Sequence, residues 1–155
     1  MKKSTLTISI VVVIALAILI FNPFGNEING NVVSAGEITM YKSPTCGCCV
    51  GNSQVLKADG FDVNIVPTSD MSSIKAKYNI PRDMESCHTS IIGDYFVEGH
   101  IPTEIINKLL EEQPDIDGIA LPNMPAGSPG MPGVKSYEWI IYALKDGKST
   151  EYMRY

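Results

Sequence analysis

The chain has 155 residues, of which 12 are Lys or Arg and 17 are Asp or Glu, and its formal net charge is -5. This length suits one domain of ordinary size. The acidic balance, with no run of more than two basic residues, argues against nucleic acid as a partner, because phosphates need a basic surface. Hydrophobic residues make up 45% of the chain, so it can bury a core and is unlike a disordered protein.

The first 24 residues join a positively charged start to a long apolar run. Lys2 and Lys3 precede an unbroken apolar segment at 10–21. The export machinery recognises this order and keeps the lysines on the cytoplasmic side of the membrane. We therefore expect residues 1–24 to form an N-terminal membrane anchor, so that the membrane is a partner of the chain.

A group of small residues at 33–35 could act as a cleavage site, although it lies far beyond the apolar run. A cleaved signal segment is therefore the alternative to an anchor. Residues 25–36 are rich in Asn and Gly and are predicted to be a linker. On either reading, residues 37–155 form an extracytoplasmic domain, in a periplasm or at the outer face of the cytoplasmic membrane.

Hydrophobic periodicity and turn signals predict alternating strands and helices in this domain. The predicted strands are 38–41, 61–66, 89–92, 95–98, 137–144 and 149–155, and the predicted helices are 48–58, 71–78 and 102–112. The order up to the third helix is β-α-β-α-β-β-α. With a Cys-x-x-Cys at the first junction of strand and helix, it predicts an α/β fold with a thioredoxin-like mixed sheet, flanking helices and a C-terminal β extension.

Three of the four cysteines lie at that first junction. Cys46, Cys48 and Cys49 follow a predicted strand and begin a predicted helix, where the helix dipole lowers the pKa of thiols. Cys46 and Cys49 can face each other across one turn, whereas Cys48 is offset from both.

The fourth cysteine and both histidines lie beside the predicted hairpin. Cys87 and His88 come just before it and His100 just after it. In a thioredoxin-like arrangement the loop before the hairpin sits opposite the start of the first helix. We therefore expect all four sulfurs to converge with His88, and His100 to reach the same end of the sheet.

Three chemistries compete for this cluster. Structural zinc sites typically use two separated Cys pairs, or a Cys pair with a His pair, and the sequence has neither spacing. Cys46 and Cys49 have the spacing of a thiol–disulfide oxidoreductase, but the adjacent Cys48 favours scrambling over a clean two-sulfur couple. Clustered thiolates suit Cu(I) and can bridge several ions, so the adjacent sulfurs are then an advantage.

The segment 121–133 is a Pro/Gly loop that carries Met124 and Met131. Thioethers are Cu(I) ligands, so both residues are candidates for the metal site. The alternative is that both methionines fill gaps in the core, which is the more common role of this residue.

The segments 41–49, 86–89, 98–102 and 124–131, taken together, resemble the CopG family of copper-resistance, metal-binding proteins. The resemblance extends over about 38–155. It implies a thioredoxin-like fold, an extracytoplasmic location, and copper binding at the C-x-C-C motif together with the Cys87–His88 pair.

The sequence therefore predicts an extracytoplasmic protein of copper resistance or homeostasis that sequesters Cu(I), in a multinuclear cluster, through clustered cysteines. The predicted ligands are Cys46, Cys48, Cys49, Cys87, His88, His100, Met124 and Met131. Conversion between Cu(I) and Cu(II), as in a copper oxidoreductase, stays open, because it needs a copper-handling or redox partner protein that the sequence does not name. The alternative function is a thiol–disulfide oxidoreductase that uses Cys46 and Cys49.

The predicted topology can be tested with a phosphatase fused after Tyr155. The fusion should be active, because the lysines at the start of the chain hold that end in the cytoplasm and direct the domain outward. Carbonate washing should leave the chain in the membrane fraction. An inactive fusion would contradict export, and release of a shorter soluble chain that starts near Gly36 would show cleavage in place of anchoring.

Overall fold

The computed structural model describes residues 36–155. The predicted anchor and nearly all of the predicted linker lie outside this range. None of the helices within it is long and apolar enough to cross a membrane.

The described domain is built on one seven-stranded mixed sheet with the strand order β2-β1-β3-β4-β5-β6-β7. The strands are β1 (Glu37–Lys42), β2 (Asp62–Pro67), β3 (His88–Ile92), β4 (Tyr95–Glu98), β5 (Gly118–Ala120), β6 (Ile140–Lys145) and β7 (Lys148–Arg154). Strand β1 pairs in parallel with β2 and antiparallel with β3. Strands β4 and β5 are parallel, and the remaining neighbouring pairs are antiparallel.

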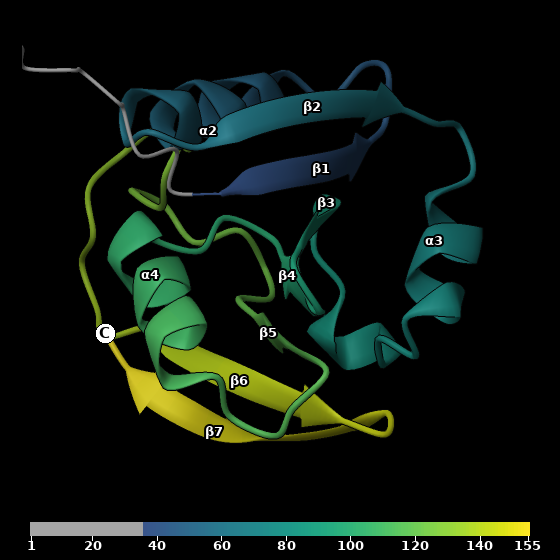
Figure 1. Ribbon diagram of the computed structural model, residues 1–155. Helices are drawn as coiled ribbons and strands as arrows, with labels where there is room; N and C mark the ends of the chain where they lie inside the picture. The colour runs from purple at the N-terminus through teal and green to yellow at the C-terminus, as the bar shows by residue number, and fades with distance from the viewer. Residues whose placement is uncertain (1–35) are drawn as a thin grey trace, which may run out of the picture. The chain divides into compact units, whose positions relative to one another are not determined.

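Helices cover both faces of the sheet (Figure 1). They are α2 (Gly47–Ala58), α3 (Met71–Lys77) and α4 (Thr103–Glu112), with a 3₁₀ turn at Arg82–Met84. Helices α2 and α4 share one buried apolar cluster with alternate residues of β1, such as Ile38 and Met40. The residues after α3 and the 3₁₀ turn pack on a second cluster around Phe96. Because side chains alternate along a strand, these two clusters lie on opposite faces of the sheet.

The predicted fold class is confirmed as a mixed α/β sheet with flanking helices and a C-terminal β extension, the hairpin of β6 and β7. The observed order from β1 to α4 is the predicted one. Strand β5 was not predicted, because its three residues are all buried and so short a buried strand has no alternation to detect. The strand predicted to begin at Tyr137 begins at Ile140, because the preceding residues belong to the long loop.

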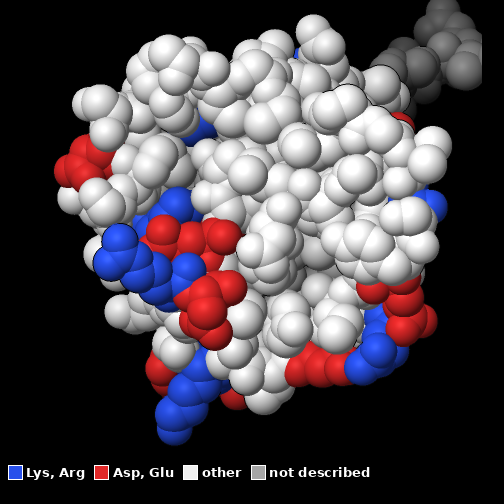
Figure 2. Space-filling view, turned by 180° about the vertical axis from the view of Figure 1, so that it is seen from behind, with Lys and Arg blue, Asp and Glu red and all other residues white. Residues whose placement is uncertain are grey.

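The surface carries acidic and basic side chains side by side in small groups, as the face drawn in Figure 2 shows. Among the described residues, exposed ion pairs join Lys145 to Asp115 and Arg154 to Glu151. Such pairs contribute little to stability, about 0–1 kcal/mol each.

A tight turn at Gly99 links β4 to His100. The Gly99 φ angle is +84°, and a Cβ atom at this position would lie 2.6 Å from both the Leu121 carbonyl oxygen and the Ser86 hydroxyl. The Gly99 amide also donates a 3.0 Å hydrogen bond to the His88 carbonyl. Glycine is therefore needed here for its conformation and for the close approach of two other segments.

Replacing Gly99 with alanine tests this requirement. Gly60 is the matched control, because its φ is +97° but a Cβ there would meet nothing within 4 Å. We expect Gly60→Ala to lower the free energy of unfolding by about 1–2 kcal/mol, the cost of a left-handed alanine. Gly99→Ala should lower the free energy of unfolding by about 1–3 kcal/mol more than Gly60→Ala does, because the new Cβ atom would also be overpacked. Equal losses in urea unfolding would contradict the close packing around Gly99.

Candidate metal centre

The C-x-C-C motif forms the turn from β1 into α2. Cys46 is the N-cap residue of α2, and its amide donates a 3.1 Å hydrogen bond to the Ser43 carbonyl. Cys46 and Cys49 form a disulfide with a Cα–Cα distance of 5.5 Å, so these two residues face each other as predicted. Cys48 is a free thiol and lies with its sulfur 3.5 Å from that of Cys46.

Cys87 lies immediately before β3, at the end of the sheet where β1 leads into the C-x-C-C motif. Its sulfur lies 3.5 Å from Cys49 Sγ and 4.0 Å from Cys48 Sγ. The structure therefore brings together all four cysteines, although two of them are 39 residues apart in the chain. The pairing of β1 with β3 produces this meeting, because it places the end of β1 beside the start of β3.

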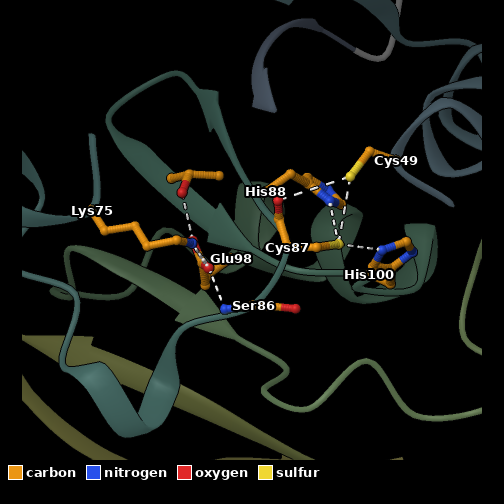
Figure 3. A network of polar contacts seen from close by, with 8 residues as sticks. Cys49, Lys75, Ser86, Cys87, His88, Glu98 and His100 are labelled. Carbon is orange, nitrogen blue, oxygen red and sulfur yellow. Dashed lines mark hydrogen bonds and ion pairs between the residues drawn. The ribbon is translucent and has the colours of Figure 1, made fainter. Parts of the chain in front are cut away.

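Both histidines adjoin the Cys87 sulfur (Figure 3). His100 Nε2 lies 2.8 Å from Cys87 Sγ, and His88 Nδ1 lies 3.5 Å from it. The other ring nitrogen of His100 lies 2.6 Å from the Pro129 carbonyl oxygen. A carbonyl only accepts hydrogen bonds, so Nδ1 carries the proton and the Nε2 lone pair of the neutral ring points to the sulfur. A carbonyl behind the ring is a common way to fix the orientation of a histidine ligand.

The cysteine and histidine donors form two overlapping groups. One contains Cys46, Cys48, Cys49 and Cys87, and the other contains Cys49, Cys87, His88 and His100. Within each group the donor atoms all lie within 4.8 Å of one another. The sulfurs of Cys49 and Cys87 belong to both groups, so two neighbouring ions could share them. Cys49 and both histidines are buried, whereas the other three cysteines are partly exposed.

Burial favours the uncharged forms of Cys87 and of both histidines. It raises the pKa of the Cys87 thiol to about 12, with a further contribution from Cys48. Burial also lowers the pKa of His88 to about 3, helped by His100, Lys75 and Lys42. The pKa of His100 is lowered by burial against the opposing effect of its hydrogen bond to Pro129. Both imidazoles are thus neutral and able to bind a metal, whereas Cys87 must first lose its proton.

The two methionines that were predicted as ligands lie in the long loop between β5 and β6. Met124 is 36% exposed and has a φ of +45°. Met131 is partly exposed and follows Gly130, whose backbone packs on Gly51 and Asn52 of α2. The clustered donors described above are cysteines and histidines, and a ligand role for the two thioethers stays a prediction.

The same loop supplies a contact that the sequence did not reveal. The Pro129 carbonyl accepts hydrogen bonds from His100 and, at 3.1 Å, from Asn52 Nδ2. It therefore ties the loop to α2 and to a candidate ligand at once. Backbone carbonyls have no sequence signature, although the Pro/Gly content of the segment predicted a loop.

A buried ion pair supports the Cys87 segment from the opposite face of the sheet (Figure 3). Glu98 is fully buried and pairs with Lys75 Nζ of α3. Its carboxylate also accepts hydrogen bonds from the Ser86 amide, at 2.5 Å, and from Thr89 Oγ1, at 2.6 Å. Burial raises the pKa of Glu98, and Lys75 is the main opposing influence. Because Ser86 and Thr89 flank the Cys87–His88 pair, Glu98 holds that pair from both ends.

Comparison with known proteins places this geometry in a family. Residues 84–131 match a family model described as "Protein of unknown function, DUF411". The chain is also similar to two solved structures titled "Copper resistance protein copG", at 38% sequence identity to each. The matches cover 77% of this chain and 98% and 96% of those chains, with TM-scores of 0.72 and 0.71. The chain belongs to the CopG family. A comparison with curated proteins gives no match.

The resemblance to the CopG family is thus confirmed. The segment that the family model matches contains Cys87, His88 and His100 but begins after the C-x-C-C motif. It also contains Glu98 and Pro129, the two supports of the histidines and Cys87.

The ion pair of Glu98 predicts a large loss of stability when one partner is removed. Lys75→Met leaves a buried carboxylate unpaired and should lower the free energy of unfolding by about 3–5 kcal/mol. The double variant Lys75→Met/Glu98→Gln should regain most of this loss, because a neutral amide oxygen still accepts from Ser86. Urea unfolding measures both.

The exposed pair of Lys108 and Glu112 provides the control. Lys108→Met should change stability by about 0.5 kcal/mol or less. A similarly small loss for Lys75→Met would show that the buried pair does not hold the Cys87 segment in place.

Proposed function

We propose that this chain binds Cu(I) at the site formed by Cys46, Cys48, Cys49, Cys87 and the two histidines, as an extracytoplasmic protein of copper resistance or homeostasis. The single observation that carries the proposal is the convergence of four cysteine sulfurs and two imidazoles in two overlapping donor groups. Similarity to two solved copper resistance proteins supports copper as the metal. We further propose that residues 1–24 attach the domain to the membrane or direct its export.

The donor set fits the chemistry of Cu(I). Soft thiolates select Cu(I), and imidazole also suits copper. Shared sulfurs at Cys49 and Cys87 allow more than one ion to bind. Zinc is the closest competitor, because a four-cysteine set also suits zinc even though the sequence spacing does not resemble that of familiar zinc sites. The proposal therefore needs a direct competition between the two metals.

The disulfide gives the site a two-electron couple. Breaking the Cys46–Cys49 bond takes up two electrons and yields two thiolates, both of which belong to the donor groups. Two Cu(I) ions that become Cu(II) supply two electrons, so the reaction balances without another reductant. Copper redox activity of this kind is the finer part of the proposal, and a copper-handling or redox partner protein would deliver or remove the ions.

The observed disulfide also favours a second function. Cys46 and Cys49 have the spacing and position of a thiol–disulfide oxidoreductase, and they are oxidised in the structure. Exchange with a partner would proceed by attack of the partner's thiolate on one sulfur of this bond, with release of the other sulfur. Cys48 and Cys87 are unnecessary for that reaction, which makes them the residues that distinguish the two functions.

Metal competition tests the choice of copper. Reduced protein should hold Cu(I) against a Cu(I)-specific chelator, in more than one equivalent per chain, and an excess of Zn(II) should not displace it. The measurement is the copper and zinc content after equilibration and desalting. A single tightly held zinc ion, with copper binding only weakly, would overturn the proposal.

A substitution at Cys48 separates copper binding from thiol exchange. Cys48→Ser removes one sulfur of the four-cysteine group and should lower the number of Cu(I) ions bound, while insulin reduction, if the parent shows any, should persist. Gly47→Ala is the matched control, because a Cβ there meets nothing within 4 Å and no sulfur is lost. Full copper loading of Cys48→Ser and of Cys87→Ser, with disulfide reduction by the parent, would favour the oxidoreductase.

A further inference from the structure

Lys42 occupies a core position at the end of β1 that lies beside the candidate metal centre. The residues of β1 alternate, and the buried face carries Ile38, Met40 and Lys42, which are 1%, 0% and 4% exposed. The first two belong to the apolar cluster beneath α2 and α4. A lysine is thus found where the pattern calls for a third apolar residue, and such a departure from a local rule often marks a functional site.

The pairing of β1 with β3 sets Lys42 directly opposite His88. Residues opposite each other on paired strands project to the same face of the sheet, so the lysine side chain and the imidazole share the face that bears the cysteines. The Lys42 charge also contributes to the low pKa of His88, although less than burial, His100 and Lys75 do. The ammonium group therefore acts on the donors of the site.

Lys42 has no acidic partner among residues 36–155. Its Nζ donates a 2.9 Å hydrogen bond to the Ser43 carbonyl, which occupies one of the three donors of an ammonium group. The buried carboxylate of this part of the chain, Glu98, is paired with Lys75. Glu98 is also paired in register with Thr89, the neighbour of His88, and so it projects to the opposite face.

Burying an ammonium group without a counter-charge is energetically unfavourable. When the cysteines form a disulfide and neutral thiols, the site offers no negative charge to offset it. Metal binding changes this, because all four sulfurs of the reduced site become thiolates while fewer than four Cu(I) ions bind. Each thiolate beyond the number of Cu(I) ions leaves one negative charge on the face on which Lys42 lies.

We infer that Lys42 is the counter-charge of the thiolates in the copper-loaded site, a positioning residue that destabilises the empty site and stabilises the loaded one. This inference rests on the proposed function. It assigns to Lys42 a role that depends on charge, because a lysine that acted only through the packing of its stem would be equally well replaced by methionine.

The test compares Lys42→Met, Lys42→Arg and the exposed control Lys57→Met in the full chain purified in detergent. Lys42→Met should weaken Cu(I) binding at least tenfold in competition with bathocuproine disulfonate, since it keeps the stem and loses the charge. Lys42→Arg keeps the charge and should remain within about threefold of the parent. Lys57→Met removes the same charge from the surface of α2 and should have no effect.

The thermal unfolding temperature distinguishes this role from a purely structural one. If Lys42 served only to stabilise the fold, Lys42→Met would lower the unfolding temperature of the copper-free protein. In the copper-free protein, Lys42→Met should unfold at the same temperature as the parent or a higher one, because a buried unpaired charge is removed. The increase in unfolding temperature on adding Cu(I) should be smaller in Lys42→Met than in the parent.

Unchanged Cu(I) affinity in Lys42→Met would overturn the inference, as would an equal loss in Lys42→Arg or a lower unfolding temperature of the copper-free Lys42→Met protein. These outcomes are distinct from failure of the proposed function. If the parent itself does not bind Cu(I), the copper assignment fails, whereas a parent that binds and a Lys42→Met variant that binds equally well refute only the role of Lys42.

Discussion

The antiparallel pairing of β1 with β3 is the constraint on which the candidate site depends. It fixes Lys42 opposite His88, so the turn that follows β1 and the residue that precedes β3 must meet at the same end of the sheet. The C-x-C-C motif lies in that turn, and Cys87 is that preceding residue. The next pairing, of β3 with β4, then returns the chain through Gly99, and His100 arrives beside the same sulfur. A shift of β3 by one residue would send His88 to the opposite face of the sheet.

The two faces of the sheet differ in their electrostatics at this end. On the face with the cysteines, both imidazoles are neutral and the Cys87 thiol keeps its proton. Lys42 is buried there and has no carboxylate partner within residues 36–155. On the opposite face, by contrast, Glu98 and Lys75 neutralise each other and anchor the segment around Cys87. The compensated pair thus holds the backbone in place, and the uncompensated face carries the cysteine and histidine donors that we propose bind the metal.

Most of the architecture could be predicted because hydrophobic alternation and helix caps are local signals. The predicted convergence of Cys87 with the C-x-C-C motif came from the order of elements and is seen in the structure. Pro129 could not be predicted as the partner of His100, because the contact uses a backbone carbonyl and depends on how a long loop folds onto α2. The disulfide was only one of several outcomes open to four thiols. Lys42 did have a sequence signal, because a charged residue stands where the alternation of Ile38 and Met40 predicts an apolar one. This signal can be interpreted only once the buried face of β1 is known.

X-ray absorption at the copper edge of the reduced, Cu(I)-loaded chain tests the central claim most directly. If the clustered cysteines and histidines hold the metal, the spectrum should show sulfur as the dominant first-shell scatterer, with a smaller nitrogen contribution. A copper–copper distance should also appear, because the two donor groups share Cys49 and Cys87. A first shell of oxygen and nitrogen alone would contradict the account, since it would place the copper away from the cysteine cluster.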